Sequence, residues 1–482
     1  MRTTHNELLE LIRNHEKLTT RQQVSLTAKL SMPAILAQIS FIIMQYIDAS
    51  MVGHLGAECS AAVGLVSTTT WLFFGLTESL VAGFAVLVAH KLGARDVKAA
   101  RDVLRQALTV CILWAVLIAM AGVAISPFLP GWLNGGEDAS PLASSYFMIF
   151  SIGMPFYQLN YFSASMLRSS GNVKFPSVLN FIMCILDVIF NYFLINDTHE
   201  VTIFGSKYLL HCAGLGVSGA ALGSTLAVSL VSVVMAWYLF CRSKELRICG
   251  ERGSFRPEKD NMQRTLKIAV PIGLERSVMS LAATVVVAIV APLGNVSISA
   301  DTLAVTIEGL CYMPGFGIAD AATTLIGQCV GAGRRRLARS FAKITLISGM
   351  LVLTVMALIM FLTARFAMSL MTPVDEIIDL GATILKIEAF AEPFFAAAIV
   401  CYGVFVGAGN SVAPIAINVS SMWLIRIPLS FFIVGKMGLT GVWIVMAGEL
   451  VARGIFHLIY LRSGRWLNTQ AMREAIAKNR KL

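Results

Sequence analysis

Residues 107–133 read ALTVCILWAVLIAMAGVAISPFLPGWL, a stretch that contains no Asp, Glu, Lys or Arg. A second block without these four residue types runs from Leu142 to Leu167. A helix needs about 20 residues, each rising 1.5 Å, to cross ~30 Å of hydrocarbon. Both blocks are long enough, and their apolar residues are continuous instead of alternating with a period of two. They therefore predict transmembrane helices and not barrel strands.

The composition of the whole chain agrees with this interpretation. Hydrophobic residues make up 56% of the 482 residues and charged residues only 14%, whereas soluble proteins average about 25% charged residues. We expect an all-α integral membrane protein with twelve transmembrane helices. The predicted spans lie at about 30–52, 62–90, 106–130, 142–166, 175–195, 214–240, 267–292, 299–330, 342–363, 382–406, 412–434 and 438–461.

The distribution of positive charge predicts the orientation. With both termini in the cytoplasm, the cytoplasmic segments hold most of the 38 Lys and Arg residues, as the positive-inside rule requires. The net charge of +10 is then a topology signal, and nucleic acid is not an expected partner. We expect a multi-pass protein of a bacterial inner membrane that contacts the lipid bilayer and works as a monomer.

The chain repeats itself with an offset of 238 residues. Pro33 corresponds to Pro271 and Asn180 to Asn418. The other matches are Leu55-Gly56 with Leu293-Gly294, Gly93-Ala94 with Gly331-Ala332, Pro155 with Pro393, Gly171-Asn172 with Gly409-Asn410, and Pro176 with Pro414. Each half holds six spans, so the halves form a parallel repeat, which is typical of transporters.

The repeat predicts two lobes that rock about a central cleft. The expected division is a cytoplasmic lead-in with a short amphipathic helix (1–28), an N-lobe (29–240), a cytoplasmic linker (241–266), a C-lobe (267–461) and a cytoplasmic tail (462–482).

Ionisable side chains inside a span cost at least ~2.5–3.5 kcal/mol on insertion scales, so each one indicates function. In the N-lobe, Asp48 and Asp187 lie in the outer half of their spans, and Asn180 and Asn191 share a helix face with Asp187. Carboxylates and neutral oxygens suit a proton or a hard cation such as Na⁺. The predicted ion-coupling site is Asp48, Asp187, Asn180, Asn191, Ser224 and Thr225. Alternatively, the two asparagines only tie helices together by hydrogen bonds.

The C-lobe has its own acids. Glu275, Glu308 and Glu392 are candidates for a transport role, although Glu275 could instead form a structural ion pair with its neighbour Arg276. Arg426, alone in its span, is expected to pair with an acid. Further intramembrane acids without an assigned role are Glu78, Glu388 and Glu449. Adaptable apolar contacts for a substrate in the cleft could come from Trp71, Tyr157 and Met313.

Several kinds of chemistry have no support. The nine cysteines include no CxxC pair and no histidines stand at metal-ligand spacing, so we expect no metal site. No phosphate-binding GxxxxGK[ST] loop occurs, and no clustered nucleophile or acid–base set indicates an enzyme. No cofactor is expected beyond a coupling ion, H⁺ or Na⁺.

Four motifs together resemble the multidrug and toxic compound extrusion (MATE) family over nearly the whole chain. They are Asp48-Ala-Ser-Met-Val-Gly-His-Leu-Gly56, Leu167-Arg-Ser-Ser-Gly-Asn172, Thr324-Leu-Ile-Gly-Gln-Cys-Val-Gly-Ala332, and Val406-Gly-Ala-Gly-Asn410 with Arg426-Ile-Pro428. The resemblance, to NorM- and DinF-like members, implies the MATE fold and an antiporter that exports cationic lipophilic compounds, drugs among them, in exchange for H⁺ or Na⁺.

The resemblance also implies that Asp48 and Asp187 are the coupling pair of the N-lobe and that Glu275 acts in the C-lobe. Some relatives have an Asn where this chain has Met183, and a small hydroxyl residue matches Ser224, so both ions stay open. The alternative function is a flippase for lipid-linked saccharides, or an exporter of another endogenous metabolite.

Overall fold

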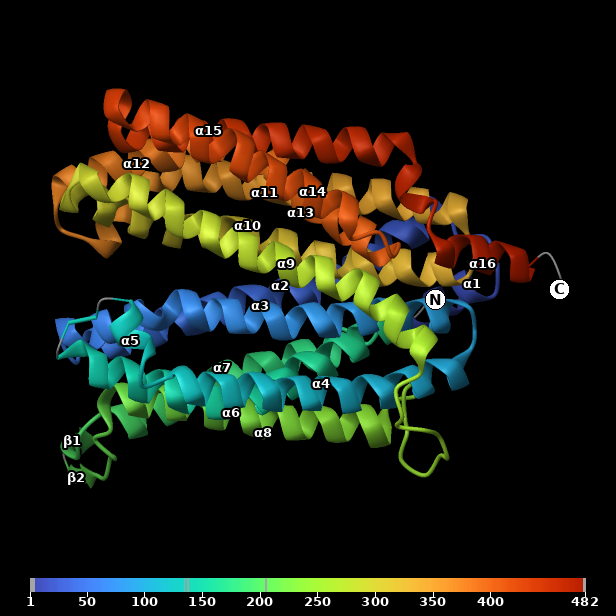
Figure 1. The fold of residues 1–482 in the computed structure, drawn as a ribbon, viewed down its shortest axis with the longest axis horizontal. Helices are drawn as coiled ribbons and strands as arrows, with labels where there is room; N and C mark the ends of the chain where they lie inside the picture. Colours follow the sequence, from blue (N-terminus) through green and yellow to red (C-terminus); the bar gives the residue numbers. More distant parts are fainter. Residues whose placement is uncertain (1–4, 134, 137, 204–205, 480–482) are drawn as a thin grey trace.

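The computed structural model describes residues 5–133, 135–136, 138–203 and 206–479 and shows two bundles of helices side by side (Figure 1). The N-lobe contains α2 (Thr20–Gly53), α3 (Ala57–Gly93), α4 (Val97–Ile125), α6 (Ala139–Ser170), α7 (Lys174–Ile195) and α8 (Gly216–Trp237). The C-lobe contains α9 (Lys259–Val290), α10 (Asn295–Gly331), α11 (Arg335–Met371), α12 (Asp375–Ala389), α13 (Glu392–Gly407), α14 (Val412–Ser421) and α15 (Ile427–Ser463).

Several short helices and strands lie at the two ends of the lobes. They are α1 (His5–Arg13), α5 (Leu129–Trp132), the antiparallel strands β1 (His199–Ile203) and β2 (Ser206–Leu210), and α16 (Gln470–Asn479). Single turns of 3-10 or π helix are η1 (Tyr238–Arg242), η2 (Ala291–Leu293), η3 (Met422–Arg426) and η4 (Arg465–Leu467). The terminal helices α1 and α16 and the segment between η1 and α9 lie at one end of the molecule, and β1, β2 and α5 lie at the other (Figure 1).

Twelve helical spans cross the long dimension of the molecule, which confirms the prediction. Among the described residues, nine helical segments are long and apolar enough to cross a membrane, and the bent pair α12 and α13 makes a tenth. The more polar α6, with 32 residues, is the eleventh. The twelfth comes from a turn inside α15 at Gly438, whose φ of 57° and ψ of −145° are non-helical and suit glycine.

The span expected at about 382–406 is present, but it is longer than expected and is not one continuous helix. The tenth span begins at Asp375 and consists of α12 and α13, which are bent by 57° at a break after Ala389. A proline at the second position of α13, Pro393, lacks the N–H that would continue the hydrogen-bond ladder across this break. The break places Glu392 at the first residue of the new helix.

The outer surface of the bundles is apolar. Leu362, Leu424 and Phe432 are each more than 70% exposed, which in water would be an unusual concentration of large hydrophobic side chains. In a lipid bilayer the exposure of these apolar side chains carries no free-energy penalty, and the helices satisfy their own backbone hydrogen bonds. The exposed surface therefore fits a bilayer.

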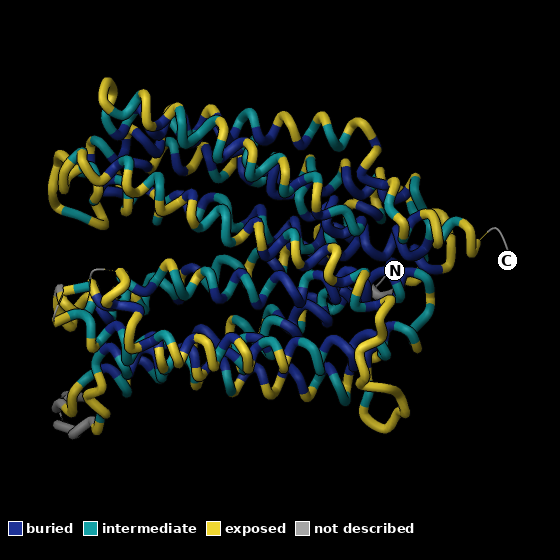
Figure 2. The backbone as a smooth tube through the Cα atoms, viewed as in Figure 1, coloured by how far each residue is buried: buried dark blue, intermediate teal, exposed yellow. Residues whose placement is uncertain are grey.

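The two lobes approach most closely at the end that carries the termini, where buried backbone is densest (Figure 2). A cluster of buried side chains there joins α1, α2, α10, α11 and α13 with the C-terminal segment, and Leu8, Leu9 and Ile12 of α1 are part of it. This confirms the amphipathic helix expected in the lead-in. The first span itself begins earlier than expected, at Thr20.

Two glycines at this interface, Gly93 and Gly331, occupy equivalent positions in the internal repeat. A Cβ added to Gly93 would lie 2.2 Å from the carbonyl oxygen of Gln328, and one added to Gly331 would lie 1.9 Å from that of His90. His90 and Gln328, like Gly93 and Gly331, are related by the offset of 238 residues. The two lobes thus meet through symmetry-related contacts in which only glycine permits the backbones to come this close.

We expect Gly93→Ala to destabilise the protein by about 1–3 kcal/mol, because the new methyl group overlaps the backbone of α10. The matched control is Gly64→Ala in the same helix, where an added Cβ meets nothing within 4 Å, so that its intrinsic gain in helix propensity is at most ~1 kcal/mol. Thermal unfolding in detergent, followed by tryptophan fluorescence, measures both. Equal unfolding temperatures for the two variants would contradict the close approach.

Candidate functional site

The N-lobe brings three predicted coupling residues into direct contact. The Asn191 amide nitrogen donates to Asp48 Oδ1 at 2.8 Å and to Asp187 Oδ2 at 3.1 Å. Asp187 and Asn191 are buried within α7, and Asp48, near the end of α2, is half-buried. One buried amide thus holds two carboxylates from helices that are far apart in the sequence.

The other predicted members of this site are divided. Ser224 of α8 lies beside Asp187. Thr225 instead lies beside Tyr157 and Gly153 of α6. The side-chain amide oxygen of Asn180 is buried and has no hydrogen-bond partner in the described part of the chain. The compact site therefore consists of Asp48, Asp187, Asn191 and Ser224, with Asn180 two helical turns away along α7.

This N-lobe site has spare oxygen ligands. Asp187 Oδ1 and Asn191 Oδ1 are buried and make no geometrically acceptable hydrogen bond to described residues. Two carboxylates and an amide oxygen suit a proton or a hard monovalent cation. Within the described ranges, no three His, Cys, Asp or Glu side chains are grouped as ligands of a metal ion.

A cavity of about 320 Å³ lies between the lobes. Its walls come from α3 and α6 of the N-lobe and from helices of the C-lobe, and its charged lining residues are Glu78, Arg168, Glu275, Arg276, Asp320 and Arg453. Two ion pairs cross between the lobes here, Glu78 with Arg276 at 3.7 Å and Arg168 with Asp320 at 3.9 Å. These two ion pairs beside the cavity therefore have to break if the lobes move apart here.

Glu275 faces this cavity and does not pair with its neighbour Arg276, whose partner is Glu78. Tyr402 donates its hydroxyl to Glu275 Oε2 at 2.6 Å, and Asn418 donates to Glu275 Oε1 at 2.7 Å. The alternative of a structural Glu275–Arg276 pair is wrong in this structure. Asn418 is the repeat counterpart of Asn180, so the two lobes use the same asparagine position differently.

A second group of C-lobe acids is fully buried. Glu388 and Glu392 are each 0% exposed, and none of their four carboxylate oxygens has a hydrogen-bond partner among the described residues. Glu308 of α10 is also buried and acts on both electrostatically. Charged carboxylates without donors are costly in a low-dielectric interior. These side chains therefore favour a protonated state or a shared cation.

Arg426 pairs with an acid as expected, and the acid is Glu449. Arg426 Nη2 lies 2.7 Å from Glu449 Oε2, and Arg453 Nη2 lies 2.7 Å from Glu449 Oε1. Glu449 is 0% exposed. Two guanidinium groups thus share one buried carboxylate.

Trp71, Tyr157 and Met313 are not among the described residues that line the cavity. Trp71 is half exposed and Tyr157 packs against Phe74 and Phe150. Their role in a substrate cleft stays a prediction.

Sequence reasoning missed two cavity residues, Asp320 and Arg453. Arg453 lies within the predicted span 438–461 and is buried there, but it was not singled out as an intramembrane charge. Asp320 interrupts an apolar helix, and that signal could have identified it from the sequence.

A helical membrane protein with two related six-span lobes, buried carboxylates and a charged cavity between the lobes is a multi-pass membrane transporter. The family model MatE matches residues 33–193 and again residues 271–432. The chain therefore belongs to the MatE family. The two matches begin at the two prolines that the offset of 238 residues relates, which supports the internal duplication.

Relatives cover nearly the whole chain at low identity. "Probable multidrug resistance protein NorM" of Thermotoga maritima is 25% identical over 446 residues, which are 91% of this chain and 92% of the relative. "Multidrug and toxin extrusion protein 1" of Danio rerio is 22% identical over 460 residues, 93% of this chain and 73% of the relative.

Solved structures share the fold. A MOP superfamily transporter from Pyrococcus furiosus has a TM-score of 0.85 at 19% identity, covering 98% of this chain and 100% of that chain. The Vibrio cholerae MATE transporter VcmN in its bent form has a TM-score of 0.80 at 18% identity, covering 95% and 98%. At these identities the likeness concerns the fold alone.

Proposed function

We propose that this protein is a secondary active antiporter that exports cationic lipophilic compounds, drugs among them, in exchange for H⁺ or Na⁺. The observation that carries the proposal is the buried N-lobe site, in which one amide joins Asp48 to Asp187. The names of the relatives, which refer to multidrug resistance and toxin extrusion, support this substrate class.

The proposed cycle uses the carboxylate pair as a switch. With the molecule open to the outside, a proton or Na⁺ binds at Asp48 and Asp187 and neutralises part of their charge. The neutralised N-lobe then favours the state that opens to the cytoplasm, where a new substrate molecule binds. Coupling requires only that ion and substrate each bind one of the two states better.

The C-lobe acids are proposed to take part at two levels. Glu275, which faces the cavity, supplies a negative charge for a cationic substrate. Glu308 and Glu392, together with Glu388, form a buried group that takes up protons or a cation without direct access to the cavity. Small organic cations are the proposed partners in both cases.

The proposed placement follows the charge distribution. The end of the molecule with both chain termini and the linker is the cytoplasmic end, and the protein resides in the inner membrane of a bacterium. Residues 29–240 and 267–461 are the moving lobes, 241–266 connects them, and one chain is sufficient for transport.

A flippase for lipid-linked saccharides is the alternative. The arginines of the cavity favour it, since Arg168, Arg276 and Arg453 could meet a pyrophosphate. Each of them is paired with an acid, however. The cavity therefore offers no unpaired positive charge among these three residues, and a cation exporter fits better.

Efflux of ethidium from drug-sensitive cells is the test. We expect cells that express the protein to export the dye several-fold faster than cells with an empty vector. Imposed proton and sodium gradients identify the coupling ion, because dissipating the coupled gradient stops efflux and dissipating the other does not. If no organic cation moves under either gradient, the proposal of drug export fails and transport of lipid-linked saccharides should be measured.

A further inference from the structure

Two cysteines of the linker lie side by side at the end of the molecule that carries the termini. Cys241 Sγ and Cys249 Sγ are 2.7 Å apart. Unlinked sulfur atoms are normally farther apart than this, and the S–S bond of a disulfide is ~2.05 Å long. Cys249 is exposed and Cys241 is half-buried, whereas five of the nine cysteines are buried in the lobes.

The backbone holds the two sulfur atoms in place. The Ile248 and Cys249 amides both donate to the carbonyl oxygen of Phe240, at 2.9 and 3.0 Å, so the chain returns to its starting point within nine residues. Inside this turn, Leu246 is fully buried and its amide donates to Ser243 Oγ. The proximity of the cysteines is therefore built into the turn.

We propose that Cys241 and Cys249 are a redox modification site that closes reversibly into a disulfide. In a reducing cytoplasm the resting form is the dithiol. A low-molecular-weight disulfide such as oxidised glutathione is the oxidant: the Cys249 thiolate attacks one of its sulfur atoms and expels one glutathione thiolate. The Cys241 thiolate then attacks Cys249 and expels the second. The two protein thiols lose two electrons and two protons, and two glutathione thiols are released.

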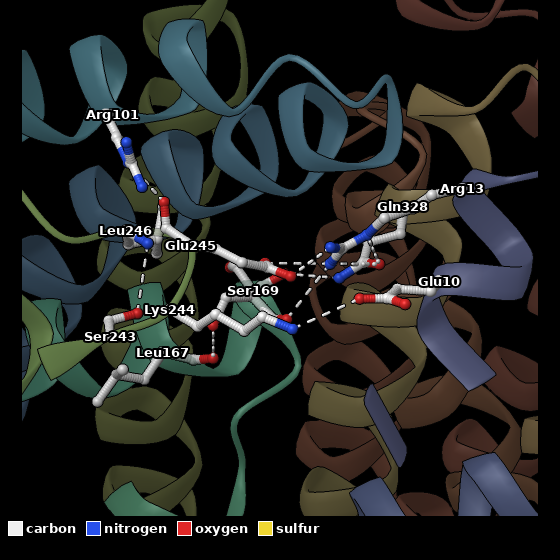
Figure 3. Close-up of polar contacts among 11 residues, drawn as sticks. Glu10, Arg13, Arg101, Leu167, Ser169, Ser243, Lys244, Glu245, Leu246 and Gln328 are labelled. Atoms are coloured by element: carbon white, nitrogen blue, oxygen red, sulfur yellow. Dashed lines mark hydrogen bonds and ion pairs between the residues drawn. The ribbon is translucent and has the colours of Figure 1, made fainter. Parts of the chain in front are cut away.

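Glu245 lies inside the ring that the disulfide closes, and its polar contacts reach α1 and α4 (Figure 3). The Glu245 carboxylate forms an ion pair with Arg13 of α1. The backbone carbonyl oxygen of Glu245 accepts a hydrogen bond from Arg101 of α4 at 2.8 Å. Arg13 also donates to Gln328 of α10 at 3.2 Å, and Gln328 donates to the carbonyl oxygen of Ser169 at 3.0 Å.

These contacts form a clamp, defined here as Arg13, Glu245, Gln328 and Ser169, which joins the linker and the N-lobe to the C-lobe. Opening toward the side that carries the termini has to break it. Closing the ring restricts Glu245, so oxidation strengthens the clamp and slows the cycle. This consequence, unlike the disulfide itself, rests on the proposed transport function.

Thiol labelling of the purified full-length protein tests the disulfide. Oxidised glutathione is expected to remove Cys241 and Cys249 from maleimide labelling together, to yield a peptide cross-linked through both, and to be reversed by dithiothreitol. In Cys249→Ser no cross-linked peptide forms. The matched control, Cys59→Ser with Cys212→Ser, replaces the other two cysteines that are not buried and leaves the cross-link unchanged. A stable glutathione adduct on Cys249 with Cys241 still open to maleimide would overturn the proposal.

Dye efflux after oxidation tests the consequence. The oxidised wild type is expected to export ethidium several-fold more slowly than the reduced wild type, while Cys249→Ser is unaffected by the same treatment. Unchanged efflux despite a complete cross-link would refute the role of the clamp. If the reduced wild type exports no dye, the proposed function fails while the labelling result stands by itself.

Discussion

Asp187→Asn is expected to reduce gradient-driven dye efflux to the level of cells without the transporter. The asparagine has nearly the same shape but carries no charge and cannot take up a proton, so it removes half of the negative charge of the N-lobe pair. Asp48→Asn should have the same effect, because Asn191 joins both carboxylates in one site. Neither gradient should then drive efflux.

Folding has to be separated from coupling in this experiment. Because Asn replaces a buried carboxylate in a membrane interior, where charge is costly, both variants should be at least as thermally stable as the wild type and equally abundant in the membrane. Asp379→Asn, at an exposed acid of α12, is the matched control and should export dye normally. If Asp187→Asn exports dye as fast as the wild type, coupling occurs at another site, and the C-lobe acids are the next candidates.

Glu449→Ala is expected to lower the free energy of unfolding by about 3–5 kcal/mol. The substitution leaves the buried Arg453 and the largely buried Arg426 without their shared carboxylate, and an uncompensated buried charge is among the most destabilising changes in a protein. Thermal unfolding of the detergent-extracted protein, followed by size-exclusion chromatography, measures the effect.

Two further variants show whether the buried charge is the cause. Asp379→Ala breaks the ion pair with Arg365, in which both side chains are more than half exposed, and should cost less than ~1 kcal/mol. Adding Arg426→Met to Glu449→Ala removes one of the two orphaned charges and should restore part of the stability. If the double variant is no more stable than Glu449→Ala, cavity formation and not unpaired charge explains the loss.

The sequence alone predicted the features that depend on local composition and on internal repetition. Charge-free blocks such as 107–133 identify the spans because the bilayer demands about 20 apolar residues in a row. The duplication followed from a constant offset, and the MatE matches begin at the same two prolines. Asp48 and Asp187 stood out because charged side chains are rare and costly inside membranes.

Predicting the partner of each charged side chain was harder. The sequence indicated that Arg426 needs an acid but not that Glu449 supplies it, and it suggested Arg276 for Glu275, which bonds to Tyr402 and Asn418 instead. The bend before Glu392 was also missed, because α12 and α13 together are long and apolar enough to be taken for one continuous span.

Only the tertiary structure decided which side chains meet. Hydropathy reports whether a helix is buried in lipid, but the rotation of each helix about its axis and the distance between helices determine its contacts. Those quantities depend on packing between distant segments, as at Gly93 against Gln328 and Gly331 against His90. The apolar blocks of this chain determined that it spans the membrane twelve times, whereas the packing of helices within and between the lobes determined where its buried charges are paired.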